Sequence, residues 1–175
     1  MYKRQVSSVA PDGRRAAVLK GDELWVVDLV RSVPMRVATN LASNPRTAWS
    51  PDGNRIAFAA RHDEREEIYV GSLDGQAELV PTTDEAFKGV TDWSRDGRTI
   101  VFWVQNAETG VDLWLLPLDG DREPVPYLRG PANESGGKIS PDGRWLAYHS
   151  NETGTPEIYV QSFPCLLYTS DAADD

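Results

Sequence analysis

A short turn motif that returns four times along the chain constrains its fold more than any other feature. The motif reads APDG at 10–13, SPDG at 50–53, SRDG at 94–97 and SPDG at 140–143, so its aspartates lie 40, 44 and 46 residues apart. A second motif keeps step with it, reading LWV at 24–26, IYV at 68–70, LWL at 113–115 and IYV at 158–160, with aromatic residues 44, 45 and 45 positions apart. Two motifs in phase at this period predict an array of identical units built of strands.

Each repeat can be read as four short strands joined by turns. The turn at 50–53 suits a type I turn, because Pro presets φ and Gly accepts a positive φ. A charged loop is expected at 61–66, and Asp74-Gly75 is a second turn signal. No long window has helical periodicity, and the mostly apolar runs are typical of strands covered on both faces. The expected strands of the second copy are 46–49, 55–59, 67–73 and 77–80.

The sequence therefore predicts an all-β chain that forms a partial β-propeller of about four four-stranded antiparallel blades, the last one incomplete. The repeated aromatics are assigned to packing between blades rather than to ligand stacking, because they recur in one register. The repeated aspartates are assigned to turn geometry rather than to catalysis or metal binding, since an active site rarely needs four equal sets. The expected blades span about 6–39, 45–81, 89–128 and 136–164.

The two ends of the chain depart from the repeat. Residues 2–5 can be encoded by TATAAGAGACAG and residues 165–169 by TGTCTCTTATACACA. The second string begins with the reverse complement of the first eleven bases of the first, in a shifted frame. Both ends resemble the transposon end of sequencing-library adapters. We therefore expect 1–5 and 165–175 to be adapter-derived and 6–164 to be a fragment of a longer gene. On this interpretation Cys165 is not native, and the fragment has no cysteine for disulfides or thiolate metal sites.

The composition is acidic. The whole chain carries a formal net charge of −9, and the fragment 6–164 carries 16 basic and 24 acidic residues, a net charge of −8. This balance argues against a nucleic-acid or anionic-membrane partner. The segment 61–67 mixes both signs and is expected to be a solvated loop. No apolar stretch approaches the ~20 residues of a membrane span.

The residue types that carry chemistry form no catalytic constellation. His62 and His149 lie near the ends of expected strands, without a His or Cys partner at metal-ligand spacing, and are interpreted as exposed. There is no Gly-x-Ser-x-Gly elbow, no phosphate-binding Gly-rich loop and no protein-kinase catalytic motif. No catalytic, cofactor-binding or metal-binding residue is therefore assigned, and no cofactor is expected. Two carboxylate pairs are expected in loops beside turns, where the second matches only a fragment of a calcium loop: Glu66/Glu67 and Asp119/Asp121.

The repeat consensus, Ser-Pro-Asp-Gly-Arg/Asn-x-Ile/Leu-Ala-Phe/Tyr followed by Ile-Tyr-Val, resembles the WD40-like (PD40) repeat of TolB-type β-propellers over 6–164. The first copy departs with Ala10 for Ser and the third with Arg95 for Pro, and the Gly-His and Trp-Asp signatures of true WD40 repeats are missing. Such propellers form periplasmic TolB, the lid of prolyl-oligopeptidase-like serine peptidases, and the sensory region of bacterial Ser/Thr kinases and winged-helix regulators. The last copy, WLAYHSNETG at 145–154 and EIYVQSFP at 157–164, is most similar to the kinase propellers.

The resemblance implies a non-catalytic binding or sensing module of a larger bacterial protein, a Ser/Thr protein kinase or related regulator. A protein or small-molecule ligand is expected at the loop ends of the blades. Two alternatives stay open. A peptidase lid predicts a Gly-x-Ser-x-Gly domain beyond 164, and a TolB-like periplasmic scaffold predicts an upstream signal peptide. The resemblance is compatible with an extracytoplasmic or periplasmic location without selecting one, and it identifies neither ligand, blade number nor oligomeric state.

The ends of the array predict low stability for the isolated segment. A blade buries its faces against its neighbours, so the first and last blades each keep one face without a partner. We expect this segment alone to be marginally stable and prone to aggregation.

Overall fold

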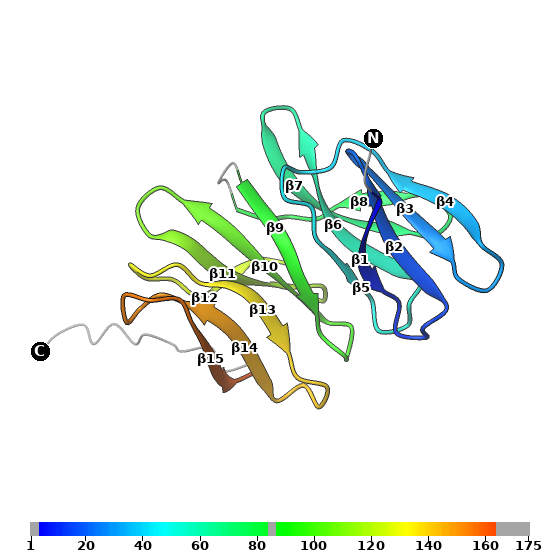
Figure 1. The fold of residues 1–175 in the computed structure, drawn as a ribbon. Helices are drawn as coiled ribbons and strands as arrows, with labels where there is room; N and C mark the ends of the chain where they lie inside the picture. Colours follow the sequence, from blue (N-terminus) through cyan, green and yellow to red (C-terminus); the bar gives the residue numbers. More distant parts are fainter. Residues whose placement is uncertain (1–3, 84–86, 164–175) are drawn as a thin grey trace, which may run out of the picture.

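The computed structural model describes residues 4–83 and 87–163 and confirms the all-β propeller architecture. Four antiparallel sheets succeed one another along the chain, and each is one blade whose strands keep their sequence order (Figure 1). Blade 4 has three strands in the described part of the chain, so the last blade is incomplete, as predicted.

The strands of the first two blades come from the first half of the chain. Blade 1 consists of β1 (Arg4–Val9), β2 (Arg15–Lys20), β3 (Glu23–Asp28) and β4 (Val33–Ala38). Blade 2 consists of β5 (Thr47–Trp49), β6 (Arg55–His62), β7 (Arg65–Ser72) and β8 (Ala77–Leu79).

The strands of the last two blades follow in the same pattern. Blade 3 consists of β9 (Phe87–Trp93), β10 (Thr99–Asn106), β11 (Gly110–Pro117) and β12 (Val125–Leu128). Blade 4 consists of β13 (Ser135–Ile139), β14 (Trp145–Ser150) and β15 (Glu157–Ser162).

The first strand of each blade is its inner strand. β1 contacts β5, β5 contacts β9, and β9 contacts β13, so the inner strands lie side by side and the blades fan outward from them. Figure 1 shows blade 1 in blue and blade 4 in orange at opposite ends of this array.

The repeated turn joins each inner strand to the second strand. In the second copy, the Ser50 carbonyl accepts a hydrogen bond from the Gly53 backbone N–H at 2.8 Å. Gly53 has a φ of 68°, a left-handed conformation that costs glycine little. The other three copies close in the same way, with positive φ at the glycine. The turn chemistry read from the sequence is thus the chemistry that links the strands.

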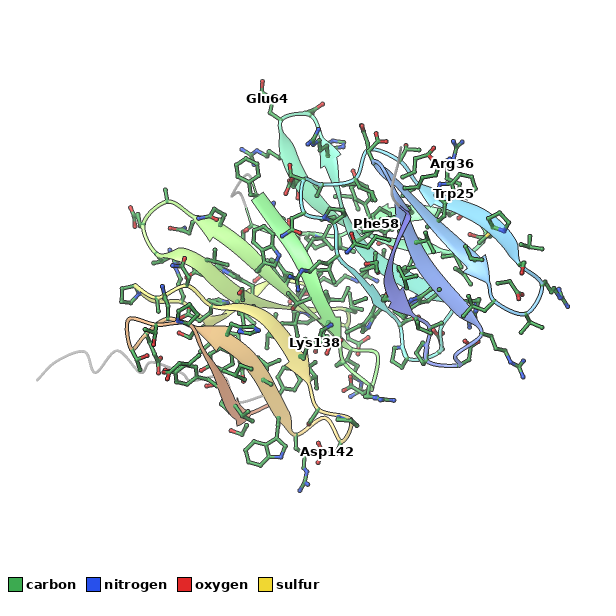
Figure 2. All side chains as sticks on the ribbon, viewed as in Figure 1. Trp25, Arg36, Phe58, Glu64, Lys138 and Asp142 are labelled. Carbon is green, nitrogen blue, oxygen red and sulfur yellow. The ribbon has the colours of Figure 1, made fainter. Side chains whose placement is uncertain are left out.

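The core consists of three apolar clusters, one between each pair of successive blades. Each cluster combines residues from facing sheets, and Phe58, between blades 1 and 2, is 1% exposed (Figure 2). Tyr69, Trp114 and Tyr159 pack in these interfaces, as predicted, and Tyr69 stacks on Phe58 with ring centroids 5.9 Å apart. Trp25 instead lines a hollow on the side of blade 1 away from blade 2, so its assignment to packing between blades is not met in this chain. Because the sheets are covered from both sides, the inner part of β6 is buried at five successive residues.

One expected loop is a hairpin instead. The charged segment 61–67, expected to be solvated, continues β6 to His62 and starts β7 at Arg65, with only two residues between them. Asp63 makes the tight turn with a φ of 55°, and Figure 2 shows Glu64 at its tip. Glu66 is only 3% exposed, because its carboxylate accepts the Ser43 backbone N–H at 2.6 Å. The loop assignment for Glu66 and Glu67 was therefore wrong: charge composition alone does not reveal this backbone partner.

At the N-terminal end, β1 includes two residues of the range 1–5. Arg4 pairs with Lys20, and Gln5 pairs with Leu19. Ladder hydrogen bonds are made by backbone groups and accept nearly any residue, so this pairing does not bear on the expected origin of these codons. The other expected adapter-derived segment, 165–175, lies outside the described residues.

Candidate ligand-binding surface on the inner strands

The inner strands carry short polar side chains that bond from blade to blade. Between blades 1 and 2, the hydroxyls of Ser8 and Thr47 are 2.5 Å apart, and Thr47 Oγ1 also donates to Ser7 Oγ at 3.0 Å. These residues are about 40 positions apart in the chain, so only the stacking of blades brings them together. The contacts between neighbouring inner strands are consequently polar, whereas the interfaces between the sheets of successive blades are apolar.

A second polar connection joins blades 3 and 4. Asp92 Oδ2 accepts the Ile139 backbone N–H at 2.8 Å, and Asp92 Oδ1 lies 3.7 Å from the ammonium of Lys138. The same ammonium donates to the Thr91 carbonyl. Figure 2 shows Lys138 on β13 beside β9. The cation and the carboxylate together fix the register of two neighbouring inner strands.

A hollow of about 300 Å³ opens where the inner strands of blades 1 to 3 run into their turns. Two indoles line it, and each has a guanidinium over its ring: Arg15 lies 5.8 Å from the Trp49 centroid and Arg55 5.1 Å from the Trp93 centroid. Both indoles are largely buried, with Trp49 7% and Trp93 5% exposed, and the polar groups of Ser8, Asp92 and Arg95 also line the hollow. This lining suits a ligand that forms hydrogen bonds.

Two smaller hollows lie toward the start of the inner strands and share Asn44 and Arg46. One, of about 290 Å³, extends to β1, and the other, of about 250 Å³, extends to β13 and includes the indole of Trp103. Arg46 is exposed there, and it is the cationic residue common to both linings. An anionic or amide group entering from this side would meet a guanidinium.

The repeated aspartates are fully engaged in their turns. Each accepts the backbone N–H two residues further on, at 2.9–3.2 Å, and in the last three copies the motif serine also donates to it, at 2.5–2.6 Å. The hydrogen bond from Ser140 and that from Arg144 lower the pKa of Asp142 to about 2. Asp142 lies at the tip of its turn in Figure 2. These carboxylates are turn-forming groups, which matches the assignment made from their recurrence.

The other candidate residues lie apart from the three hollows. His62 ends β6 with its ring nitrogen Nδ1 3.2 Å from the Tyr69 hydroxyl, and His149 is exposed on β14. Asp119 forms an exposed ion pair with Arg98 at 3.4 Å, and Asp121 is exposed. Within residues 4–83 and 87–163, no group of three or more His, Cys, Asp or Glu side chains could hold a metal ion. In the same residues, no helix is long and apolar enough to span a membrane.

Sequence reasoning missed the charged groups that are buried between blades. Lys88 on β9 is 0% exposed, and its ammonium bonds Glu67 on β7 at 3.0 Å, Thr82 at 3.1 Å and the Thr83 carbonyl at 2.7 Å. The available signal was weak: one lysine near the start of an otherwise mostly uncharged inner strand.

A second buried charge lies between blades 3 and 4. Glu134 is 6% exposed, and burial raises its pKa, with the Asp112 carboxylate adding to the shift and the Ser150 hydroxyl opposing it. Among the described residues, Oδ1 of Asp112 and Oε2 of Glu134 both lack a hydrogen-bond partner. Glu134 lies one residue before β13 and is equivalent to Lys88 when both are counted back from the turn serine. Thus the same position holds a paired cation in blade 3 and a destabilised carboxylate in blade 4.

Comparisons with known proteins place this geometry in context. No family model matches the chain. It is 27% identical over 198 residues to the uncharacterized peptidase YuxL of Bacillus subtilis, which covers 85% of this chain and 29% of that protein. It is 26% identical over 128 residues to the tricorn protease homolog 1 of Streptomyces coelicolor, and this match covers 71% of this chain and 12% of that protein. The chain spans less than a third of the length of either protein.

Solved structures share the architecture. A TolB-type protein of Agrobacterium tumefaciens superposes with a TM-score of 0.78 at 23% identity, covering 92% of this chain and 58% of that one. TolB of Acinetobacter baumannii superposes with a TM-score of 0.79 at 18% sequence identity, and the match covers 92% of this chain and 41% of that one. Dipeptidyl peptidase 4 of Porphyromonas gingivalis superposes with a TM-score of 0.65 at 13% sequence identity, and the match covers 91% of this chain and 31% of that one. The chain therefore shares the β-propeller fold of the TolB proteins and of peptidase propeller domains.

Proposed function

We propose that this chain is a non-catalytic binding module whose ligand occupies the inner-strand hollows at the loop ends of the blades. The observation that carries the proposal is the hollow where polar side chains converge from three blades: Ser8 of blade 1, Thr47 of blade 2 and Asp92 of blade 3. Neither His62 nor His149 lines this hollow or the two hollows that share Arg46. The linings of the three hollows thus offer hydrogen-bonding groups and include no histidine that could serve as a general base.

For the parent protein, we propose a bacterial Ser/Thr protein kinase or related regulator, in which the propeller senses a ligand. The support is the likeness of the last repeat, at 145–164, to the propellers of such kinases. Sequencing the gene on both sides of 6–164 tests this. A kinase or winged-helix domain upstream is the expected result, and its absence would refute the proposed parentage.

A peptidase is the second candidate for the parent. It is favoured by the names of the relatives, since YuxL is called a peptidase and the Streptomyces coelicolor protein a tricorn protease homolog. A Gly-x-Ser-x-Gly hydrolase domain in the same gene would support this reading, in which the propeller filters substrate and the catalytic residues lie in the other domain. A TolB-like periplasmic scaffold would instead be supported by a signal peptide upstream and neither domain.

The binding proposal itself is tested with capped hexapeptides whose central residues are acidic, basic, amide or aromatic. Chemical shifts of backbone amides and indole N–H groups report where each peptide binds. We expect saturable shifts at residues lining the three hollows, and weaker binding after Arg46→Ala for the acidic peptides. A matched control is Arg31→Ala, which removes an exposed arginine from a turn on the outer side of blade 1. Shifts spread evenly over outer strands β4, β8 and β12, or none at millimolar peptide, would contradict the proposal.

A further inference from the structure

Every copy of the repeat has an acidic residue directly before its second motif: Glu23, Glu67, Asp112 and Glu157. Between blades 2 and 3 this carboxylate is paired, because Glu67 accepts a hydrogen bond from the ammonium of Lys88 at 3.0 Å. The Thr82 hydroxyl and the Thr83 carbonyl, in the connection between these blades, accept from the same ammonium at 3.1 and 2.7 Å. A carboxylate at this repeat position thus binds a primary ammonium between two blades.

Between blades 3 and 4 the carboxylate is kept, but a second carboxylate replaces the ammonium. Asp112 takes the place of Glu67, and Glu134 takes the place of Lys88. The second strand of each blade confirms the equivalence. The Ser150 hydroxyl of β14 donates to Glu134 Oε1 at 3.3 Å, and the residue of β10 that pairs with Lys88 holds the same place in blade 3.

The two carboxylates are buried and only partly bonded. Asp112 is 1% exposed, and its Oδ2 accepts the Thr109 hydroxyl at 2.6 Å. The other oxygen of Asp112 and Oε2 of Glu134 have no hydrogen-bond partner among the described residues. A buried carboxylate oxygen without a partner is costly. The interface therefore has two acceptors in place and lacks the donor that Lys88 provides between blades 2 and 3.

A hollow of about 500 Å³ opens beside Glu134, between the connection from blade 3 to blade 4 and the β14–β15 turn. It lies between two described blades and not on an end face of the array. Its lining includes the apolar side chains of Leu128, Pro131 and Ala132 as well as Glu134 and Glu152. Such a lining suits a slim aliphatic stem that ends in a cation.

The charge around the hollow also favours a cation. The carboxylates of Glu134 and Glu152 line it, and Arg129, the one cation among its described lining residues, is exposed. Burial raises the pKa of Glu134, and the carboxylates of Asp112 and Glu152 add to this shift. A positive group beside Glu134 would relieve the repulsion among these three acids.

We propose that the hollow between blades 3 and 4 binds a primary ammonium on an aliphatic stem, the lysine side chain of a basic peptide, with Asp112 and Glu134 as its acceptors. The ligand supplies from outside the cation that Lys88 supplies from within the chain between blades 2 and 3. Because the acceptor oxygens are buried, a compact ammonium fits them better than a planar guanidinium. The hollow shares no lining residue with the three inner-strand hollows, so this site does not depend on the proposed function.

The test is a chemical-shift titration of the 175-residue chain near neutral pH with two probes. The first is Nα-acetyl-lysine N-methylamide, and the second is the same molecule acetylated at Nε, which keeps the stem and removes the charge. We expect the lysine probe to shift the amides of 128–134 and 151–154 saturably, and the acetylated probe to bind at least about tenfold more weakly, because it offers no cation to the buried carboxylates.

Two substitutions separate this site from general attraction to an acidic chain. Glu134→Gln should weaken binding of the lysine probe at least about tenfold, since it removes one of the two acceptor charges. The matched control is Glu64→Gln, which removes an exposed negative charge at the tip of the β6–β7 turn and should leave binding unchanged (Figure 2). Circular dichroism checks the fold, and Asp112→Asn takes the place of Glu134→Gln should that variant fail to fold.

Glu134→Lys gives an independent readout, because it introduces at this position the residue type that blade 3 has. Its ammonium should pair with Asp112, as Lys88 pairs with Glu67, and should abolish binding of the lysine probe. No shifts at millimolar lysine probe, equal binding of the two probes, or binding that Glu134→Gln and Glu134→Lys leave unchanged would overturn the proposal.

Discussion

Replacing Lys88 with methionine tests how much one buried charge contributes to the contact between blades 2 and 3. Its ammonium, 0% exposed as a side chain, is 3.0 Å from Glu67 of β7, whose side chain is 16% exposed. Methionine keeps the aliphatic stem and removes the cation. Glu67 then retains the Thr82 hydroxyl at 2.8 Å, while the Thr83 carbonyl loses its donor.

Removing one partner of a buried ion pair costs about 3–5 kcal/mol, because the other charge stays buried without compensation. Water reaches part of Glu67, so we expect the low end, about 3 kcal/mol, for Lys88→Met. Adding Glu67→Gln removes the stranded charge and keeps a hydrogen-bonding group beside Thr82. The double variant should therefore recover about 2 kcal/mol of that loss.

Urea unfolding followed by tryptophan fluorescence measures these free energies from the midpoint and slope. Arg36→Met is the matched control, because Arg36 pairs with Glu23 at 3.2 Å on the exposed side of blade 1, where Figure 2 shows it beside Trp25. An exposed pair contributes about 0–1 kcal/mol. A loss below about 1 kcal/mol for Lys88→Met, or no recovery in the double variant, would show that the pair does not hold the two blades together.

Three further substitutions probe packing, turn geometry and charge. Gly89→Ala should lower the free energy of unfolding in urea by about 1–3 kcal/mol, because a Cβ there would lie 2.6 Å from the Trp103 indole nitrogen. Gly130→Ala is the control: its Cβ would meet no atom of the described residues within 4 Å, so the free energy of unfolding should change by less than about 0.5 kcal/mol. Equal effects of the two substitutions would refute the steric argument. Ser50→Ala should lower the free energy of unfolding by about 1–2 kcal/mol, because it removes the hydroxyl that accepts the Arg55 backbone N–H at 2.9 Å and donates to Asp52 at 2.5 Å. An unchanged melting temperature would contradict this expectation. Burial raises the pKa of Glu134 in the folded state above the unfolded value near 4.5. The protonated side chain therefore stabilises the fold below the unfolded pKa, and this stabilisation is lost as pH rises through the higher folded pKa. Glu134→Gln should flatten the dependence of the unfolding free energy on pH between pH 4.5 and 8, and a steeper dependence would contradict the direction of the pKa shift.

The repeats predicted the architecture because their information is local. The turn at 50–53 contains within four residues the Pro, Asp and Gly that its geometry requires, and its recurrence sets the blade period. The aromatics at 69 and 114 were assigned correctly for the same reason: a shared register implies a shared packing environment. Blade structure therefore follows from sequence distances of a few residues.

The details of the candidate site depend on contacts between blades, which no local pattern reports. Thr47 meets Ser7 and Ser8 from about 40 positions away. Glu66, expected in a solvated loop, is buried because the Ser43 backbone approaches it from the strand-to-strand connection. Both contacts arise only once consecutive sheets are stacked, so the residues that line the hollows could not be identified in advance.

Residue-level hydrogen exchange tests the central claim that face-to-face burial between successive blades holds this chain together. The measurement is made on the 175-residue chain at low concentration. Blades 2 and 3 are covered on both faces, so amides of β6 and β10 should exchange at least about tenfold more slowly than those of β2 and β14. Equal protection in all four blades, or slower exchange at the ends, would contradict the account.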